Sequence, residues 1–469
     1  MANEEYRATL AHLYGLRRFG MRPGLEVIRS LLGALDHPEE RFRAIHVTGS
    51  KGKGSVSAIA AEILEASGRP TGRFTSPHLK SYRERIQVRR RPISASAVVD
   101  GVARVREASD ELLRKGAIDR NPTFFEVTTA LAFDHFARKG VEHAVIEAGL
   151  GGRLDSTNVL RSTVGVVTTI ELEHTEILGP TERDIAQEKA GIFHAGIRGI
   201  VGELKAPARD ALEATARGAG VPLWHLGRQI QVRGRRLEPG GQRLDITTPP
   251  GSFDDLGLPL AGSFQAGNAA LAIAAALEHA RSLGAPITES ELRKGLGHVR
   301  WRGRLEKLPG RPDLYVDVAH TPESARALAL SLGEIAPFEE PQENAIVFGC
   351  LDDKRVDPIF EALAPLARTL VAVPVRSARS LDTAALRRIA VGRFPRVVVS
   401  PDLPTGFALA RAATGPDGFT LVTGSDYLVG ELLRNLEGGE DEPDLSDVVT
   451  AAASDEVVRP RAPSTAGDR

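Results

Sequence analysis

The chain has 469 residues, of which 42% are hydrophobic and 26% charged, the composition of a globular protein with two or three domains. Its 60 lysines and arginines nearly balance 61 aspartates and glutamates, so the basic excess typical of nucleic-acid-binding proteins is absent. A single cysteine, Cys350, excludes an intramolecular disulfide and a cysteine-cluster metal site. The charged N-terminus MANEEYRATL lacks the apolar stretch of a signal peptide, and no apolar run is long enough to span a membrane. We therefore expect a cytoplasmic protein with neither nucleic acid nor membrane as a partner.

Short β-branched stretches alternate with longer helical patterns as far as residue 436. The helix predicted over 55–68 ends at Gly68 and carries on one face Val56, Ile59, Ala60, Ile63 and Leu64. Residues 225–262 alternate like β-hairpins with Gly and Pro turns. Apolar runs predict buried strands at 45–49, 143–149, 163–170, 314–320, 343–349, 369–375, 396–400 and 419–425. This alternation predicts parallel sheets with right-handed crossovers.

A stretch rich in Gly, Pro and charge, WRGRLEKLPGRPD at 301–313, separates two blocks of strand–helix alternation. We therefore predict an N-terminal domain over 1–300 and a smaller domain over 301–436. Residues 437–469 are acidic, poor in aromatic residues, and rich in Pro, Ser and Ala near their end. This composition predicts a disordered tail, and a solvated extension is favoured over a partner-binding segment.

The strongest local signal is HVTGSKGKGSVSAIA at 46–60, where a strand, a Gly-rich turn, a lysine, a serine and a helix follow one another. Backbone N–H groups of such a turn, the helix N-terminus and the lysine can hold phosphates, and the serine can reach Mg²⁺. The spacing departs from the usual phosphate loop, because Val47 replaces the first glycine and Gly54 separates Lys53 from Ser55. A plain Gly-rich turn with solvated lysines is the alternative. The predicted nucleotide-binding residues are Gly49, Ser50, Gly52, Lys53, Gly54 and Ser55.

Acidic residues follow two of the predicted strands. Glu147 ends the strand 143–149, and Glu171, Glu173 and His174 end the strand 163–170. Ligands of open α/β sheets bind at the carboxyl ends of parallel strands, and Mg²⁺ prefers oxygen ligands. Each acid alone could be a solvated strand end, but together they favour a magnesium–nucleotide site.

Two further polar residues have competing explanations. Glu126 stands three residues after Thr123, the spacing of a capping box that opens a helix, and we favour this structural role. Lys189 follows a helical stretch and on spacing alone is a charge at a helix C-terminus, with a phosphate-directed or modified lysine as the alternative.

Polar residues also surround two later helix starts. Gln265 and Asn268 lie at the first turn of an Ala-rich helix, where they could cap the helix or contact an adenine. Asp317 and His320 end a strand, where the histidine could touch a substrate or simply lie at a domain surface.

The order of these motifs resembles the folylpolyglutamate synthase/dihydrofolate synthase branch of the Mur ligase family, over roughly residues 5–436. No single motif would suffice, but so many in one order are highly specific. The matching segments are HVTGSKGKGS, TSPHLKSYRERI, TFFEVTTALAF, EAGLGGRLDSTN, LEHTEILG, EKAGI, WRGRLE, DVAHTP and TGSDYLVGE.

The resemblance implies an α/β fold with a P-loop NTPase-like N-terminal domain, built on a mostly parallel sheet with a small antiparallel appendage. A smaller Rossmann-like α/β domain would follow. It also implies an ATP-dependent ligase with two Mg²⁺ sites, which phosphorylates a substrate carboxylate to an acyl phosphate that L-glutamate then attacks. The partners would be folate or dihydropteroate and L-glutamate, and we expect a monomer.

Residue roles carry over by the same resemblance. Lys53 would hold the β- and γ-phosphates of ATP, and Lys189 would be carbamylated and support a second Mg²⁺, instead of acting as a helix-end charge. The implied metal ligands are Ser55, Glu147, His174 and Lys189; the implied nucleotide contacts outside the loop are Gln265, Asn268, Arg304 and Asp317. The implied substrate contacts are Ser76, Pro77 and His78 on a loop over the pterin, Asp155 near the pterin, and His320 and Ser425 near the incoming glutamate. Lys53, Lys189 and His320 would be the catalytic residues.

Four positions depart from the family pattern. They are Lys51 for Asn, Glu173 for Asp, Phe264 for His, and Thr321 for Asn, the last as in Mur ligases that add a diamino acid. None of them removes an implied catalytic or metal-binding residue, so we expect an active enzyme. A Mur-type ligase with another acceptor is the first alternative, although a phosphate loop that begins by residue 46 leaves no room for a UDP-sugar domain. A non-catalytic nucleotide-binding protein is the second.

Overall fold

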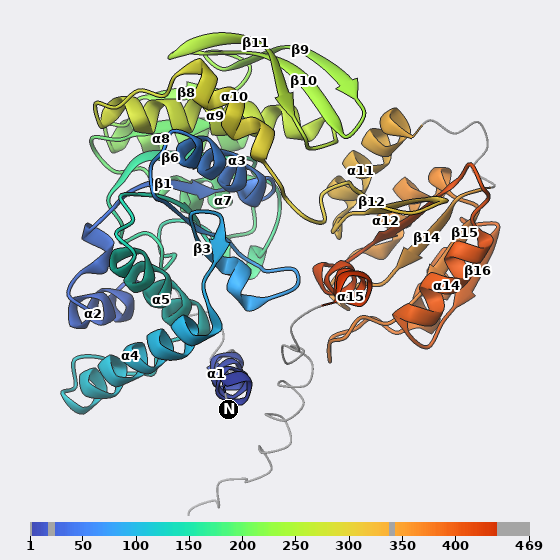
Figure 1. The fold of residues 1–469 in the computed structure, drawn as a ribbon, viewed down its shortest axis with the longest axis horizontal. Coiled ribbons are helices and arrows are strands. Elements are labelled where there is room, and N and C mark those ends of the chain that lie inside the picture. Colours follow the sequence, from blue (N-terminus) through green and yellow to red (C-terminus); the bar gives the residue numbers. More distant parts are fainter. Residues whose placement is uncertain (1, 17–23, 337–342, 439–469) are drawn as a thin grey trace, which may run out of the picture.

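The structure is a computed structural model that describes residues 2–16, 24–336 and 343–438. The described residues form three sheets in two lobes, shown in Figure 1. The first two sheets belong to one lobe, which we call the N-lobe, and the third sheet starts at Glu306 and forms the C-lobe. No described helix is long and apolar enough to cross a membrane.

The large sheet of the N-lobe has eight strands in the order β4-β3-β2-β5-β1-β6-β7-β8. Six neighbouring strands, β2, β5, β1, β6, β7 and β8, run parallel, whereas β3 and β4 form an antiparallel edge. Their bounds are β1 Arg43–Thr48, β2 Thr71–Phe74, β3 Ile86–Val88, β4 Arg91–Pro92, β5 His143–Glu147, β6 Ser162–Val167, β7 Arg198–Val201 and β8 Leu223–His225. Central β1 lies between β5 and β6, which places the ends of three parallel strands side by side.

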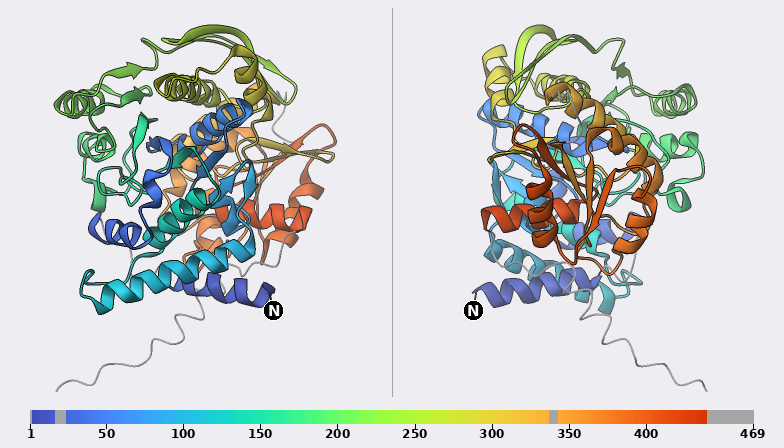
Figure 2. Two further views of the ribbon diagram at one scale, coloured as in Figure 1. Left: turned by 60° about the vertical axis from the view of Figure 1, so that its left-hand side comes forward. Right: turned by 90° about the vertical axis from the view of Figure 1, so that its right-hand side faces the viewer.

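Helices cover both faces of this sheet. Alternate residues of a strand point to opposite faces, so each strand contributes side chains to the cores on both sides. Ala44 and Ile146 face α1 Ala2–Gly15, α2 Glu26–Ala34, α4 Ala95–Arg114 and α5 Phe124–Arg138. Ile45 and Val145 face α3 Lys53–Ala66, α9 Phe264–Ser282 and α10 Glu289–His298. Near β7 lie α6 Thr175–Leu178, α7 Glu182–Ala190 and α8 Ala206–Gly218. Figure 2 shows α1 and the long α4 side by side at the far end of the N-lobe.

The helix α3 is buried on every side rather than on the single predicted face. The predicted apolar face is in the core, but Ser57 and Ala58 are buried as well. The reason is that α3 lies between the sheet and two further helices, α9 and α10, which cover its outer surface. The helix directly behind the phosphate loop is therefore fully enclosed.

The predicted hairpins form a three-stranded antiparallel sheet with β10 in the middle. Its strands are β9 Gln231–Glu238, β10 Gly241–Thr248 and β11 Gly251–Leu258. Leu244, Ile246 and Leu256 turn into the core that contains α9. This small sheet packs on the N-lobe (green-yellow in Figure 1) and also faces the C-lobe.

The C-lobe contains a six-stranded sheet in the order β12-β13-β17-β14-β15-β16, parallel except for edge strand β12. The strands are β12 Glu306–Leu308, β13 Asp313–Val316, β14 Ala345–Phe348, β15 Thr369–Ala372, β16 Arg396–Val399 and β17 Phe419–Thr423. One face packs on α11 Pro322–Ile335, α12 Val356–Leu363 and α13 Thr383–Ala390. The other face packs on α14 Leu403–Ala413 and α15 Asp426–Glu437. The predicted parallel sheets with crossover helices are confirmed in both lobes.

The last helix, α15, extends to Glu437, the residue at which the predicted tail begins. This glutamate pairs with Arg302, so it belongs to the folded C-lobe. The rest of the predicted tail, from 439 onward, lies outside the described residues.

Candidate active site

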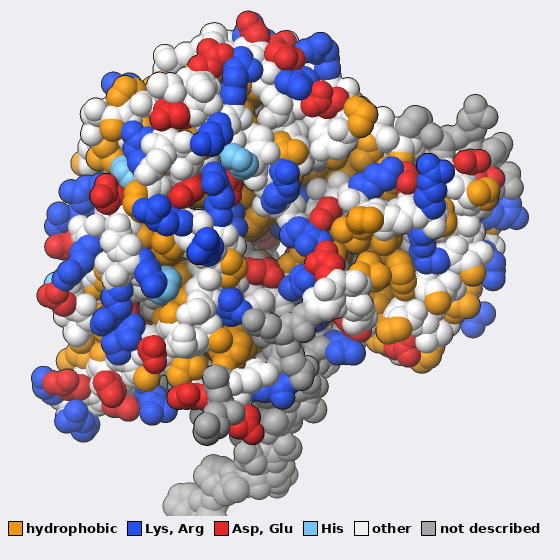
Figure 3. Space-filling model, viewed as in Figure 1, with side chains coloured by type: hydrophobic (Ala, Val, Ile, Leu, Met, Phe, Trp, Pro, Cys, Tyr) orange, Lys and Arg blue, Asp and Glu red, His pale blue; other side chains and the backbone are white. Residues whose placement is uncertain are grey.

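A cavity of about 1670 Å³ lies between the two lobes, at the carboxyl ends of β1, β5 and β6. Its far wall comes from the segment after β13 and from the start of α11 and α15 in the C-lobe. Figure 3 shows Lys, Arg, Asp and Glu side chains gathered where the lobes meet. Thirteen of the predicted site residues line it: Ser50, Gly52, Lys53, Ser55, Ser76, Pro77, Glu147, Asp155, His174, Asn268, Arg304, Asp317 and His320.

The loop between β1 and α3 has the backbone of a phosphate-binding loop. Gly49 and Gly52 have φ of 145° and 84°, a region that L side chains rarely adopt. A Cβ at Gly49 would also lie 1.9 Å from the Thr168 hydroxyl, so a side chain there would be strained and clash. The Lys53 ammonium donates to the Gly49 carbonyl at 2.8 Å and lies at the mouth of the loop. The sequence pattern predicted this loop despite its unusual spacing.

The phosphate loop is tied to the segment that follows β6. The Ser50 N–H donates to the Thr169 carbonyl at 2.8 Å, and the Lys51 N–H donates to the Thr169 hydroxyl at 2.9 Å. The Ser50 hydroxyl in turn accepts from the Glu171 N–H at 3.0 Å. Burial lowers the pKa of the Lys51 ammonium, although Glu171 and Glu173 oppose that shift.

Trp301, in the linker between the lobes, packs on the outer side of the same loop. A Cβ at Gly54 would lie 2.6 Å from the Trp301 ring, so only glycine leaves room for it. The Arg73 guanidinium lies 5.2 Å from the centre of that ring, within the range of a cation–π contact. The glycine that separates Lys53 from Ser55 thus makes space for the linker.

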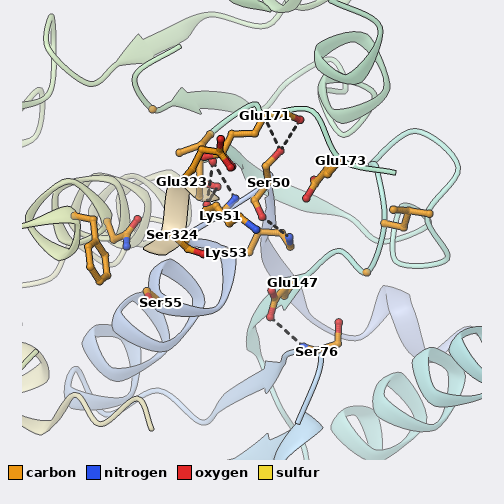
Figure 4. A pocket seen from close by; sticks show the side chains of 18 of the residues that line it. Ser50, Lys51, Lys53, Ser55, Ser76, Glu147, Glu171, Glu173, Glu323 and Ser324 are labelled. Atoms are coloured by element: carbon orange, nitrogen blue, oxygen red, sulfur yellow. Dashed lines mark hydrogen bonds between the residues drawn. The ribbon is translucent and has the colours of Figure 1, made fainter. Parts of the chain in front are cut away.

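Glu147 ends β5 beside Val47 and faces the phosphate loop, as Figure 4 shows. Its side chain is 3% exposed and accepts the Ser76 N–H at 3.0 Å. Burial raises the pKa of Glu147 to about 7, and Lys53 opposes the shift. A buried carboxylate beside a phosphate loop is a suitable ligand for a cation.

The donor set at this end fits Mg²⁺ bound together with a substrate. Mg²⁺ is typically held by one or two carboxylates plus substrate phosphates rather than by an all-protein cage. In agreement, no three His, Cys, Asp or Glu side chains among the described residues are arranged to hold a metal alone. Glu147 and the buried Ser55 hydroxyl line the cavity next to the phosphate loop.

Lys189 is 1% exposed and pairs with Glu173, with 2.9 Å between Nζ and Oε1. Burial lowers the pKa of Lys189 to about 8, and Lys53 adds to the shift. Although burial acts to raise it, Lys189 and Lys53 lower the pKa of Glu173 to about 2. Glu173, which replaces the Asp of the family pattern, therefore contacts Lys189 directly. Glu173 and His174 both line the cavity.

The first turn of α9 lies opposite the phosphate loop. A Cβ at Gly52 would meet Asn268 Oδ1 at 2.5 Å, so these two segments touch. Asn268 donates to Gln265 Oε1 at 3.0 Å, and the buried Gln265 Nε2 has no hydrogen-bond partner among the described residues. In the part of the chain that the structure describes, no side chain caps α9, so the capping alternative for these two residues is wrong. Phe264, which replaces the family's His, lines the cavity beside them.

The C-lobe places a histidine and an aspartate across the cavity. Asp317 is buried and accepts the N–H groups of Leu305 and Ala319, each at 2.7 Å. Burial raises the pKa of Asp317 to about 6, and Arg304 opposes this shift as it does at Glu147. His320 Nδ1 lies 2.9 Å from the Val318 carbonyl, to which it must donate. This bond leaves Nε2 as the acceptor of the neutral imidazole.

Thr321, another departure from the family pattern, caps α11 through a reciprocal pair of bonds with Ser324. Its hydroxyl accepts the Ser324 N–H at 3.3 Å. A helix cap explains a threonine here without a change of substrate. The predicted capping box of Thr123 and Glu126 at the start of α5 is likewise confirmed.

Three predicted residues have structural partners, and of these only Asp155 lines the cavity. His78 accepts the Arg85 Nε–H at 2.7 Å, and Ser425 caps α15 beside Asp426, which lines the cavity. Asp155 accepts the N–H groups of Leu150 at 2.8 Å and Thr157 at 3.0 Å, so it also organises its own loop.

Several cavity residues were missed by the sequence interpretation. Arg85, Phe124 and Phe125 line the end near Ser76, and Arg379 and Asp426 line the C-lobe wall. Arg85 and the two phenylalanines stand inside the quoted motifs RERI and TFFE, which could have indicated them. Arg379 follows β15 in a loop with no motif, so the sequence held no signal for it.

Comparison with known proteins agrees with this architecture. Residues 47–276 match the Mur ligase middle domain, and residues 303–426 match the Mur ligase glutamate ligase domain. The chain is 35% identical over 439 residues to the folylpolyglutamate synthase of Lacticaseibacillus casei, covering 93% of this chain and 99% of the relative. It is 31% identical over 451 residues to the dihydrofolate synthase/folylpolyglutamate synthase of Bacillus subtilis, covering 92% and 99%.

Solved structures show the same similarity. The folylpolyglutamate synthase of Mycobacterium tuberculosis complexed with ADP and AMPPCP superposes with a TM-score of 0.85 at 32% identity, covering 93% of this chain and 99% of that one. The apo form of the L. casei FPGS superposes with a TM-score of 0.82 at 33% identity, covering 92% and 100%. The predicted resemblance and the two-lobed α/β fold are thereby confirmed.

Proposed function

The chain belongs to the folylpolyglutamate/dihydrofolate synthase branch of the Mur ligase family and is an ATP-dependent ligase. We propose that it joins L-glutamate to the carboxylate of a folate or of dihydropteroate. One observation carries this proposal: a single cavity connects the phosphate loop, an aromatic pocket at Phe124 and Phe125, and a C-lobe histidine. The reaction needs a nucleotide, an acceptor and an amine to meet at one point. A solved relative, an FPGS in complex with AMPPCP and folate, supports the same pairing of ligands.

On this proposal the phosphate loop binds ATP. The N–H groups of residues 52–55, at the start of α3, would bind the phosphates, and Lys53 would turn from the Gly49 carbonyl to the β- and γ-phosphates. Asn268 lines the same end of the cavity and would contact the adenine, whereas Gln265 is buried behind it and accepts the Asn268 amide through Oε1. Residues 1–300 and 301–436 would be the two domains that meet on the nucleotide.

Two anions must approach each other in the first step, the acceptor carboxylate and the γ-phosphate. Mg²⁺ held by Ser55 and Glu147 would supply charge neutralisation at the phosphates. Lys53 and Arg304 add positive charge from the two lobes, and Arg304 lies close enough to act on both Glu147 and Asp317. The resulting acyl phosphate lies between the lobes, where closure excludes water.

The second step is attack of the glutamate amine on the acyl phosphate, with release of inorganic phosphate. The amine must lose a proton to react, and His320 Nε2 is an acceptor whose orientation the Val318 carbonyl fixes. Burial keeps this imidazole neutral by lowering the pKa of His320. We therefore propose His320 as the proton acceptor at the incoming amine.

The lysine proposed to be carbamylated, Lys189, is an ammonium paired with Glu173 when unmodified, and in that form it cannot ligate a metal. A pKa of about 8 leaves roughly a tenth of the side chain as free amine near pH 7, enough to react with CO₂. The reaction joins the amine nitrogen to the CO₂ carbon and releases one proton. The carbamate oxygens would then support a second Mg²⁺ together with His174.

The test is release of phosphate from ATP by the purified protein, with dihydropteroate or tetrahydrofolate as the acceptor and with or without L-glutamate. Release that needs glutamate and occurs with tetrahydrofolate supports the proposal, and release with both acceptors indicates a bifunctional synthase. Binding of Mg–ATP without release for either acceptor would contradict it and favour a different acceptor.

A further inference from the structure

The segment 76–80 between β2 and β3, which we call the acceptor loop, touches both lobes. At its start, the Ser76 N–H donates to Glu147 in the N-lobe at 3.0 Å. At its end, the Lys80 ammonium pairs with Glu437 at the end of α15 in the C-lobe at 2.7 Å. In Figure 1 the loop extends from the N-lobe towards α15.

Contact between this loop and α15 is close enough to require a glycine. A Cβ at Gly430 would lie 2.1 Å from the Leu79 carbonyl oxygen, which is far inside van der Waals distance. The Arg434 guanidinium donates to the Lys80 carbonyl at 3.3 Å, one helical turn further on. The Leu79 side chain packs on the C-lobe core that contains Val429. The last helix of the C-lobe therefore lies directly on the loop backbone.

The acceptor loop is internally stiff, so a force at one end reaches the other. The Glu84 carboxylate accepts three successive N–H groups, from Leu79 at 2.8 Å and from Lys80 and Ser81 at 3.0 Å each. The Arg85 side chain also donates to His78 at 2.7 Å. A loop with these internal bonds shifts as a unit, and Ser76 and Pro77 at its other end line the cavity.

Glu437 joins the loop to the linker as well as to α15. Its carboxylate binds Arg302 and Lys80, and these cations lower the pKa of Glu437 to about 2. Pairs this exposed contribute little to stability. Their value lies in fixing where the loop, the linker and the C-lobe helix meet.

We propose that Gly430 and Glu437 of α15 are positioning residues that hold the acceptor loop against Glu147 and the cavity, so that docking of the C-lobe sets the affinity for the acceptor substrate. The proposal rests on the proposed function, since it assumes that the cavity end beside Ser76 and Pro77 binds the acceptor. ATP binds elsewhere in the same cavity, at the phosphate loop, and its affinity does not depend on this contact. The loop thus links lobe docking to acceptor binding.

The main test is Gly430→Ala, with Gly333→Ala on α11 as the matched control, because a Cβ at Gly333 meets nothing within 4 Å. A methyl group at 430 must separate α15 from the Leu79 carbonyl. We expect KM for the acceptor to rise ~10-fold, because a misplaced binding group of this kind can cost one to two orders of magnitude. KM for ATP should stay within twofold, and Gly333→Ala should match the wild type.

Hydrogen exchange in the peptide 76–82 gives a second readout that does not need activity. Gly430→Ala should exchange faster in this peptide than Gly333→Ala, while peptides of the phosphate loop stay unchanged. If the wild type does not use folates at all, the proposed function fails, and faster exchange still supports the docking of α15 on the loop. Equal exchange in the two variants would overturn the proposal.

A double-mutant cycle with Lys80→Gln and Glu437→Gln extends the test to variants that keep the helix packing. Each single change should raise the acceptor KM, and the double change should cost less than the product of the singles, since they remove one shared pair. Independent effects, or an equal rise of KM for ATP and for the acceptor, would indicate a merely structural contact and contradict the proposal.

Discussion

The phosphate loop and the acceptor loop lie in the same cavity but are held in different ways. Ser50 and Lys51 are bonded to Thr169 within one lobe, and the helix behind them is enclosed. The acceptor loop instead depends on the other lobe, through Gly430 and the exposed Glu437. The nucleotide end is therefore preorganised by the N-lobe alone, whereas the acceptor end is completed only where the lobes meet. Substitutions at the two ends should fail in different ways.

The largest effect is expected at the phosphate loop. Lys53→Ala removes the ammonium at the mouth of the phosphate loop, and we expect kcat/KM to fall ~10³-fold with every acceptor, as for the loss of a preorganised transition-state donor. Initial rates of phosphate release would measure it, with the exposed Lys294→Ala as the control. A loss confined to one acceptor would contradict the assignment of nucleotide binding to the phosphate loop and of acceptor binding to the acceptor loop.

A smaller but still large loss should follow at the proposed carbamate. Lys189→Ala removes the buried amine and leaves Glu173 without its partner, and we expect activity to fall ~100-fold, as for the loss of a metal-supporting group. Added acetate or another short carboxylic acid should restore part of the rate. Wild-type activity in this variant would disprove the carbamate, and a permanent loss with intact thermal stability would leave only the ammonium–Glu173 pair as its role.

Glu147 bonds to the acceptor loop and lies beside Val47 of the strand that leads into the phosphate loop, and its raised pKa makes stability depend on pH. Its pKa is about 7 in the folded protein against an ordinary 4.5, so the folded state binds more protons between these values and loses stability as pH rises through them. Without metal, Glu147→Gln should match the wild type near pH 4.5 and be more stable at pH 8, by on the order of 1–3 kcal/mol. Thermal unfolding in the presence of a chelator would show this. Equal stability of the two proteins at pH 8 would contradict it.

The smallest effect is expected for Lys51, the second lysine of the phosphate loop. Lys51→Asn restores the family's residue and removes a cation that lies near Glu171 and Glu173. If Lys51 faces the γ-phosphate, the Kd for a non-hydrolysable ATP analogue should rise about 3- to 10-fold, and that for ADP should not change. Titration calorimetry with both nucleotides would decide. Equal weakening for both would assign Lys51 to the α- or β-phosphate.

What the sequence predicted well is local and periodic. The phosphate loop and the capping box at Thr123 depend on residues close together in the chain, so their pattern is sufficient. The predicted strands were found, but several were predicted too long at their carboxyl ends, and edge strand β16 has Arg396 and Val399 exposed rather than buried. The run 314–320, for example, leaves the sheet after Val316, because Asp317 turns to bind Leu305 and Ala319. Apolar composition does not show where a strand gives way to a binding segment.

What the sequence did not predict depends on contacts between distant residues. The Lys189–Glu173 pair joins two segments whose separate patterns suggested a helix end and a strand end. The contact between Gly430 and Leu79 joins residues from opposite lobes, and a glycine inside a helix carries no sign of what it must accommodate. Arg379 reaches the cavity only because the C-lobe sheet brings the end of β15 next to it.

The packing of Trp301 on Gly54 gives the protein an optical reporter of its own. The chain has two tryptophans, and the other, Trp224 on β8, lies next to Arg198, with the guanidinium 4.6 Å from its ring. With Trp224→Phe, the remaining indole emission would come from the one ring that touches both the linker and the phosphate loop. Nucleotide binding and lobe docking could then be followed separately by stopped-flow fluorescence, without an attached dye.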